Sequence, residues 1–232
     1  MFEDVRVVSF DADDTLWHNE QYFLDAQKSF WQLMEKFLPA QASEALMNTE
    51  VQDIELYGYG IKAFILSLIE ASIRISEGRI TSEGINSIIE LGKQMLDKPV
   101  EIIDGVEDVL KLLAGRYRLV MTTKGDLLEQ ERKLKKSGLT DYFHHIEIVS
   151  DKNEGEYRKL IQHLDISPEQ FLMIGNSLRS DVLPVLNAGG FGIHVPYHTT
   201  WEHEKIDHII VHKRFVEIAS IKDLPQLLAS KS

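Results

Sequence analysis

The sequence predicts an α/β protein in which helices cover both faces of a parallel sheet, with a small all-helical insertion. From about residue 99 onward, short apolar runs alternate with amphipathic helical patterns, which is typical of a parallel sheet. Between the first apolar run and that point, only helical patterns occur. With 232 residues, of which 44% are hydrophobic, the chain has room for one large domain or for a core with an insertion.

The first part of the chain is expected to hold one strand and then helices alone. Residues 5–10 form an apolar run typical of a buried strand. Pro39 is a helix stop signal, and Thr81 or Ser82 is a helix start signal. The expected helices cover residues 21–38, 41–48, 60–75 and 81–96. We therefore expect a helical domain over residues 17–98 and an α/β core domain over residues 1–16 and 99–232.

The second part of the chain is expected to alternate between strands and helices. Asp104 is a suitable N-cap for the first of these helices, and Gly115 a suitable end. The expected strands cover residues 118–122, 146–149, 171–174, 191–195 and 209–211. The expected helices cover residues 104–114, 126–136, 154–164, 180–188 and 221–228.

Composition excludes several classes of function. The chain has no cysteine, so it has no disulfide and no thiol chemistry. Its net charge of −12 does not suit a nucleic-acid partner. No apolar run approaches the ~20 residues of a membrane span, and no signal peptide is evident. We expect a cytoplasmic protein without a membrane partner; the oligomeric state is not indicated.

Polar side chains follow four of the expected strands. In chain order these are Asp11 and Asp13, Thr122 and Thr123, Lys152, and Asn176 with Asp181. Because the carboxyl ends of parallel strands meet at one edge of a sheet, these side chains can converge. Carboxylate and amide oxygens suit Mg²⁺, while lysine and hydroxyl groups suit a phosphate. The pattern predicts a site for a divalent cation and a phosphate.

The order of these residues resembles that of the haloacid dehalogenase-like (HAD) hydrolases. Asp11-Ala12-Asp13-Asp14-Thr15, after an apolar strand, is similar to the first motif of that family. Thr122 resembles the second motif, Lys152 the third, and residues 175–181 the fourth. The resemblance implies a Rossmann-like core, and it implies that the helical domain is a cap domain.

The resemblance also implies a role for each residue. Asp11 would be the nucleophile and would become an aspartyl phosphate. Asp13 would protonate the leaving alcohol and later activate water. Thr122 would hold the phosphoryl group with help from backbone amides, including that of Thr123. Lys152 would neutralise charge on Asp11 and on the phosphoryl oxygens.

Mg²⁺ is the cofactor that the resemblance implies. Its expected ligands are the Asp11 side chain, the Asp13 main-chain carbonyl and the fourth motif, through Asn176 or Asp181. The family usually has aspartate at position 176. The neutral asparagine predicts weaker metal affinity or an altered metal preference.

Two other choices of site residue stay open at this point. Lys159 is a rival to Lys152, but it lies within an expected helix instead of at a strand end. His194, His198 and His203 are close in sequence, and His144–His145 form a pair, but no zinc-ligand spacing stands out.

A Mg²⁺-dependent phosphatase acting on a small phosphorylated metabolite is the function that this resemblance favours. Asp13 distinguishes the chain from the family's dehalogenases and ion-pumping ATPases, which differ at that position. A phosphomutase is a minor alternative. Asn176 keeps open a non-catalytic or weakly active binding protein. Residues 17–19, Lys62 and residues 124–126 could face the substrate, or they could simply be surface residues.

Overall fold

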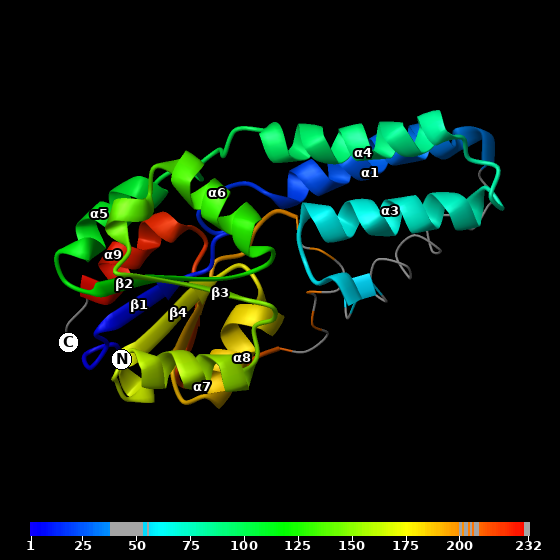
Figure 1. The fold of residues 1–232 in the computed structure, drawn as a ribbon. Helices are drawn as coiled ribbons and strands as arrows, with labels where there is room; N and C mark the ends of the chain where they lie inside the picture. Colours follow the sequence, from blue (N-terminus) through cyan, green and yellow to red (C-terminus); the bar gives the residue numbers. More distant parts are fainter. Residues whose placement is uncertain are drawn as a thin grey trace. The chain divides into compact units, whose positions relative to one another are not determined.

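The computed structural model describes residues 1–37, 53–54, 56–199, 201, 204, 206 and 209–229. Two compact units divide the chain. The α/β unit comprises residues 1–20, 100–124 and 130–232, and the helical unit comprises residues 21–99 with residues 125–129. Figure 1 shows the strands and helices of each unit. The expected helix at residues 41–48 lies outside the described residues.

The α/β unit is built on a six-stranded sheet with the strand order β3-β2-β1-β4-β5-β6. Every pair of neighbouring strands is parallel, as the sequence predicted. The strands are β1 (Val7–Phe10), β2 (Arg118–Lys124), β3 (His145–Val149), β4 (Phe171–Gly175), β5 (Phe191–His194) and β6 (Phe215–Glu217). The first strand of the chain therefore lies in the middle of the sheet, with β2 on one side and β4 on the other.

Helices cover both faces of this sheet. They are α5 (Val106–Ala114), α6 (Leu127–Ser137), α7 (Glu154–His163), α8 (Leu183–Asn187) and α9 (Leu224–Ala229). Alternate residues of the strands point to opposite faces, so β1 places Val8 and Phe10 in one core cluster and Val7 in another. The first cluster includes residues of α5, α6 and α9, and the second includes residues of α7 and α8. All four residues of β1 are buried, which explains their apolar run.

The helical unit contains α1 (Glu20–Met34), a short 3₁₀ turn (Glu35–Phe37), α3 (Ile61–Ile75) and α4 (Ser82–Asp97). Thr81 caps α4 by accepting a hydrogen bond from the Gly84 N–H, as its sequence position suggested. The unit has its own apolar core, which includes Phe30, Leu68 and Ile88. These buried positions are the helix-spaced apolar residues of the sequence. In the part of the chain that is described, no helix is both long and apolar enough to cross a membrane.

Two local predictions were wrong, and a third was right in extent but not in helix type. Helix α5 is capped by Gly105 in a left-handed conformation, and Asp104 instead pairs with Lys222 at 2.5 Å. The expected strand at residues 209–211 is absent: Ile209 and Val211 are 90% and 92% exposed, and β6 forms later in the chain. The expected helix at residues 180–188 is present, but it begins as a π-helical turn, Leu178–Val182, before α8 starts at Leu183.

Candidate active site

Asp11 follows β1 directly and is buried. Its N–H donates to the Ile174 carbonyl of β4 at 2.8 Å, so the sheet fixes its backbone. One carboxylate oxygen accepts a hydrogen bond from Lys152 Nζ, and the other accepts from Thr15 Oγ1 at 3.1 Å. Burial raises the pKa of Asp11 to about 7, although the Lys152 ammonium acts in the opposite direction. The buried Asp11 carboxyl group therefore lies against the Lys152 ammonium group, at the carboxyl end of the central strand.

Lys152 lies between two carboxylates. Its side chain is 2% exposed, and Nζ contacts Asp11 and, at 2.7 Å, Asp181. Burial alone would lower the pKa of Lys152, but the two carboxylates raise it above its ordinary value. Lys159, the rival, is 73% exposed and pairs with Glu156. The structure thus brings Lys152 to the site and leaves Lys159 on the surface.

Asp181 is held from both sides. Its other carboxylate oxygen accepts from the Ser177 N–H at 3.0 Å. A Cβ at position 175 would lie 2.1 Å from this carboxylate, so only glycine at that position allows Asp181 to pack behind β4. The π-helical turn Leu178–Val182 carries Asp181 inward to meet Lys152.

Asp13 is surrounded by hydrogen-bond donors. Trp17 Nε1 donates to it at 2.6 Å, Gln130 Nε2 at 3.0 Å, and Lys133 Nζ at 3.0 and 3.1 Å. The sequence did not indicate Gln130 or Lys133 as site residues. Their spacing of three places them on one face of α6, but a charged helix usually directs such a face to solvent. These donors fix the orientation of the Asp13 carboxylate.

Thr122 and Thr123 lie near the end of β2, the strand that pairs with β1. Thr122 Oγ1 is 2.7 Å from Ser9 Oγ of β1. Thr123 Oγ1 accepts from Gln130 Nε2 at 2.9 Å, and the same nitrogen contacts Asp13. Both threonine side chains are buried. The structure therefore joins Thr122 to β1 through Ser9, and Thr123 to Asp13 through Gln130.

Asn176 completes a set of three oxygens that fits a divalent cation. In the amide orientation that satisfies its neighbours, its nitrogen donates to Asp11 Oδ2 at 3.2 Å and to the Asp13 carbonyl at 3.3 Å. With the amide turned over, its oxygen takes that place and accepts from Thr15 Oγ1 at 3.3 Å. Adjacent oxygen ligands of an octahedral Mg²⁺ lie about 3 Å apart. The outer atom of the Asn176 amide therefore lies about as far from Asp11 Oδ2 and from the Asp13 carbonyl oxygen as neighbouring ligands of Mg²⁺ lie from each other. With the amide oxygen at this position, the three oxygens could bind one cation.

Two further residues hold the loops of the site. Asp14 has a φ of 63°, and its carboxylate accepts from the Asn19 N–H at 2.8 Å and from the Glu20 N–H. Burial raises the pKa of Asp14 to about 7. His194 at the end of β5 lies with Nε2 3.0 Å from the Asn176 carbonyl oxygen and with Nδ1 2.7 Å from Glu217. The sequence had suggested neither contact.

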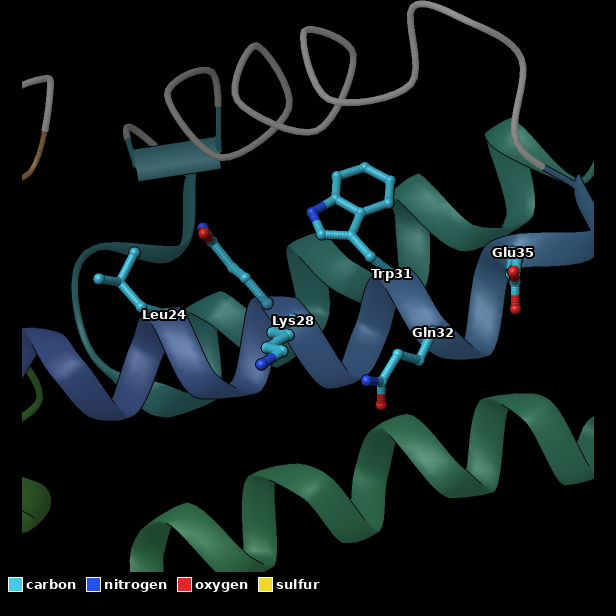
Figure 2. A pocket seen from close by; sticks show the side chains of 6 residues that line it. Leu24, Lys28, Trp31, Gln32 and Glu35 are labelled. Atoms are coloured by element: carbon cyan, nitrogen blue, oxygen red, sulfur yellow. The ribbon is translucent and has the colours of Figure 1, made fainter.

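Two further predictions concern Lys62 and the histidines. Lys62 is 58% exposed and pairs with Asp126 at 2.7 Å within the helical unit. His203 lies outside the described residues, and among those described no three His, Cys, Asp or Glu side chains group as a metal site. Figure 2 shows a surface depression whose lining residues all come from α1 and its end: Leu24, Gln27, Lys28, Trp31, Gln32 and Glu35. No predicted site residue lines this depression.

Comparison with known proteins identifies the family of the chain. The model of the haloacid dehalogenase-like hydrolases matches residues 5–189, which include the four motifs. The chain belongs to the haloacid dehalogenase-like hydrolase family. A HAD-like hydrolase structure from Xanthomonas campestris is 38% identical, with a TM-score of 0.87 over 97% of this chain and 91% of that one.

Other proteins resemble the chain over nearly its whole length. A glyceraldehyde 3-phosphate phosphatase of Methanothermobacter thermautotrophicus is 26% identical over 96% of this chain and 98% of its own. The HAD hydrolase YfnB of Bacillus subtilis, solved with bound magnesium, is 19% identical, with a TM-score of 0.69 over 97% of this chain and 99% of that one. This last likeness shows the shared fold.

Proposed function

We propose that this HAD hydrolase is a Mg²⁺-dependent phosphatase that cleaves a small phosphomonoester through an aspartyl phosphate on Asp11. The observation that carries the proposal is that two neighbouring carboxylates, Asp11 and Asp13, have different surroundings. Asp11 is buried against Lys152, whereas Asp13 is held by Trp17, Gln130 and Lys133. A nucleophile and a separate acid–base group are what two successive displacements at phosphorus require.

In the first displacement, an Asp11 carboxylate oxygen attacks phosphorus and the bond to the ester oxygen breaks. Asp13 gives its proton to the departing alkoxide, which leaves as an alcohol. In the second displacement, the Asp13 carboxylate takes a proton from water, and the water oxygen attacks phosphorus. The bond between phosphorus and Asp11 breaks, which frees phosphate and restores both carboxyl groups.

The other residues of the site bind charge. Lys152 neutralises Asp11 and the phosphoryl oxygens, which reduces the repulsion between two anions. Thr122 and the backbone N–H groups after β1 and β2 donate hydrogen bonds to the phosphoryl group. Asp11, the Asp13 carbonyl and Asn176 would hold Mg²⁺, which shields the nucleophile from the phosphate. We propose that residues 17–98 form the cap domain, which selects small substrates in a cytoplasmic enzyme.

A panel of phosphomonoesters, assayed for phosphate release with Mg²⁺ or Mn²⁺, tests this proposal. The wild type should release phosphate at least ~100-fold faster than Asp11→Asn on its preferred substrate, because the amide is a poor nucleophile. The melting temperature of the variant shows that it is folded. If no substrate separates the two proteins, the catalytic interpretation is wrong and a binding role is favoured. A phosphomutase would instead return the phosphoryl group to a substrate without releasing phosphate.

A further inference from the structure

Three hydrogen-bond donors that the proposed hydrolysis does not use converge on one carboxylate, that of Glu204. Lys124 Nζ donates to one oxygen of Glu204. Ser177 Oγ and, at 2.7 Å, Ser180 Oγ donate to the other. Ser177 and Ser180 are buried, and the side chains of Lys124 and Glu204 are 18% and 11% exposed. This set of donors is the Lys124–Ser177–Ser180 cluster.

The cluster is arranged for an anion. Burial alone would raise the pKa of Glu204, but the charge and hydrogen bond of Lys124 and the two serine hydroxyls lower it to about 2. Glu204 is thus ionised throughout the neutral range. One ammonium group and two hydroxyl groups match the single charge and the two oxygens of a carboxylate.

The donors also have hydrogen-bond partners other than Glu204. Ser177 Oγ accepts from the Ser180 N–H at 2.9 Å, so its hydrogen points toward the carboxylate. Ser180 Oγ accepts from Lys124 Nζ at 3.0 Å. The carbonyl of Lys124 accepts from Gln130 Nε2 at 3.0 Å. Glu204 itself lies outside the sheet, in the segment between β5 and β6. The two serine side chains and Lys124 Nζ thus have hydrogen bonds that do not involve Glu204.

The cluster lies at the end of the strand that carries Asp11. In the order β2-β1-β4, Lys124 ends β2 and Ser180 follows β4, so the hydrogen bond from Lys124 Nζ to Ser180 Oγ crosses the end of β1. Lys124 is two residues beyond Thr122, or about 7 Å along an extended strand. Ser177 connects through Asp181 and Lys152 to Asp11. This separation suits a substrate with a few carbon atoms between its two anionic groups.

We propose that Lys124, Ser177 and Ser180 form a second anion-binding subsite, which accepts the carboxylate of a phosphorylated carboxylic acid. Glu204 occupies this subsite when no such substrate is bound. The inference rests on the proposed phosphatase function and specifies its substrate class. Lys124, which the sequence allowed to be either a substrate contact or a surface residue, is then a substrate contact.

Two substrates that differ only in the second group test the subsite. 3-Phosphoglycerate carries a carboxylate where glyceraldehyde 3-phosphate carries an aldehyde. The quantity measured is the ratio of kcat/KM for the acid to kcat/KM for the aldehyde, with Mg²⁺ present. Lys124→Met should lower this ratio about 10-fold or more, because it removes a charged donor. Glu204→Gln should raise it several-fold, because it removes the competing charge. Lys159→Met, which deletes the same charge at an exposed position, should leave the ratio unchanged.

If each variant, Lys124→Met and Glu204→Gln, changes kcat/KM by the same factor for both substrates, the subsite is overturned. Lys124 and Glu204 would then form only a structural ion pair. If the wild type hydrolyses neither substrate, the proposed function fails, and calorimetry on Asp11→Asn then decides the subsite. Binding of 3-phosphoglycerate in preference to the aldehyde, with this preference lost in Lys124→Met/Asp11→Asn, would support it. Binding that does not depend on Lys124 would overturn it.

Discussion

Lys133 of α6 holds Asp13, a residue that follows the central strand, with Nζ 3.0 and 3.1 Å from the two carboxylate oxygens. The same nitrogen donates to Asn19 Oδ1 at 2.8 Å. One ammonium group thus ties the proposed acid–base group to the loop that follows it. The strand places the backbone of Asp13, but a helix far along the chain sets the direction of its side chain.

Replacing Lys133 by methionine should lower kcat about 10- to 100-fold, because an acid–base group that is not held in place loses its alignment with the leaving group. The KM should change little. The loss should be larger for an alkyl phosphate than for p-nitrophenyl phosphate, since a good leaving group needs no proton. Steady-state kinetics with both esters measures this difference.

Lys135→Met is the matched control for Lys133→Met, because Lys135 is exposed on the same helix. The two variants lose the same charge. If both lower kcat equally, or if the loss is the same for the two esters, Lys133 does not position Asp13.

Asn176→Asp should strengthen metal binding and lower the melting temperature of the metal-free protein. Without metal, the new carboxylate would face Asp11 Oδ2, which the Asn176 amide approaches at 3.2 Å. Two like charges at this distance repel, so the melting temperature should fall by several degrees. With Mg²⁺ the added charge becomes a ligand, and the half-saturating Mg²⁺ concentration should fall about 10-fold.

Melting curves with and without Mg²⁺, together with a Mg²⁺ titration of phosphate release, measure both effects of Asn176→Asp. A variant that melts like the wild type under both conditions would show that residue 176 is not a ligand.

Asp181→Asn should lower stability and kcat without changing the half-saturating Mg²⁺ concentration. Both oxygens of Asp181 accept hydrogen bonds from nitrogen donors, Lys152 Nζ and the Ser177 N–H, so its effect on catalysis is expected to pass through them. Removing one partner of a buried ammonium costs about 3 kcal/mol. Urea unfolding and a Mg²⁺ titration separate the two effects. A clear rise in the Mg²⁺ requirement would restore Asp181 as a metal ligand.

The core of the fold could be predicted because its signals are local. The buried run of β1, the alternation after residue 99 and the Thr81 cap are each read from neighbouring residues. The last strand could not be predicted in this way. Phe215–Glu217 is a strand because it pairs with β5, whereas the more apolar run at residues 209–211 has no such partner among the described residues. Long-range pairing decided between them.

The candidate site shows the same limit. Each motif residue could be predicted because it lies at or just after the end of an apolar strand. Lys133, Gln130 and Glu204 could not be predicted as site residues, because a charged helix and an acidic loop residue usually face water. Their contacts depend on how α6 and the segment before β6 pack on the sheet edge. The sequence alone holds no local signal for that packing.

Glu204→Gln should change how stability depends on pH. The pKa of Glu204 in the folded protein, about 2, lies below its ordinary value of 4.5, so its ionised form stabilises the fold above about pH 4.5. This stabilisation is lost as the pH falls toward 2. Between about pH 6 and about pH 3.5, the wild type should lose about 1 kcal/mol more free energy of unfolding than Glu204→Gln. Urea unfolding over this range measures the difference. Glu154→Gln, which removes an exposed partner of Arg158, should follow the wild type. Parallel curves for the wild type and Glu204→Gln would mean that Lys124 does not hold this carboxylate ionised in solution.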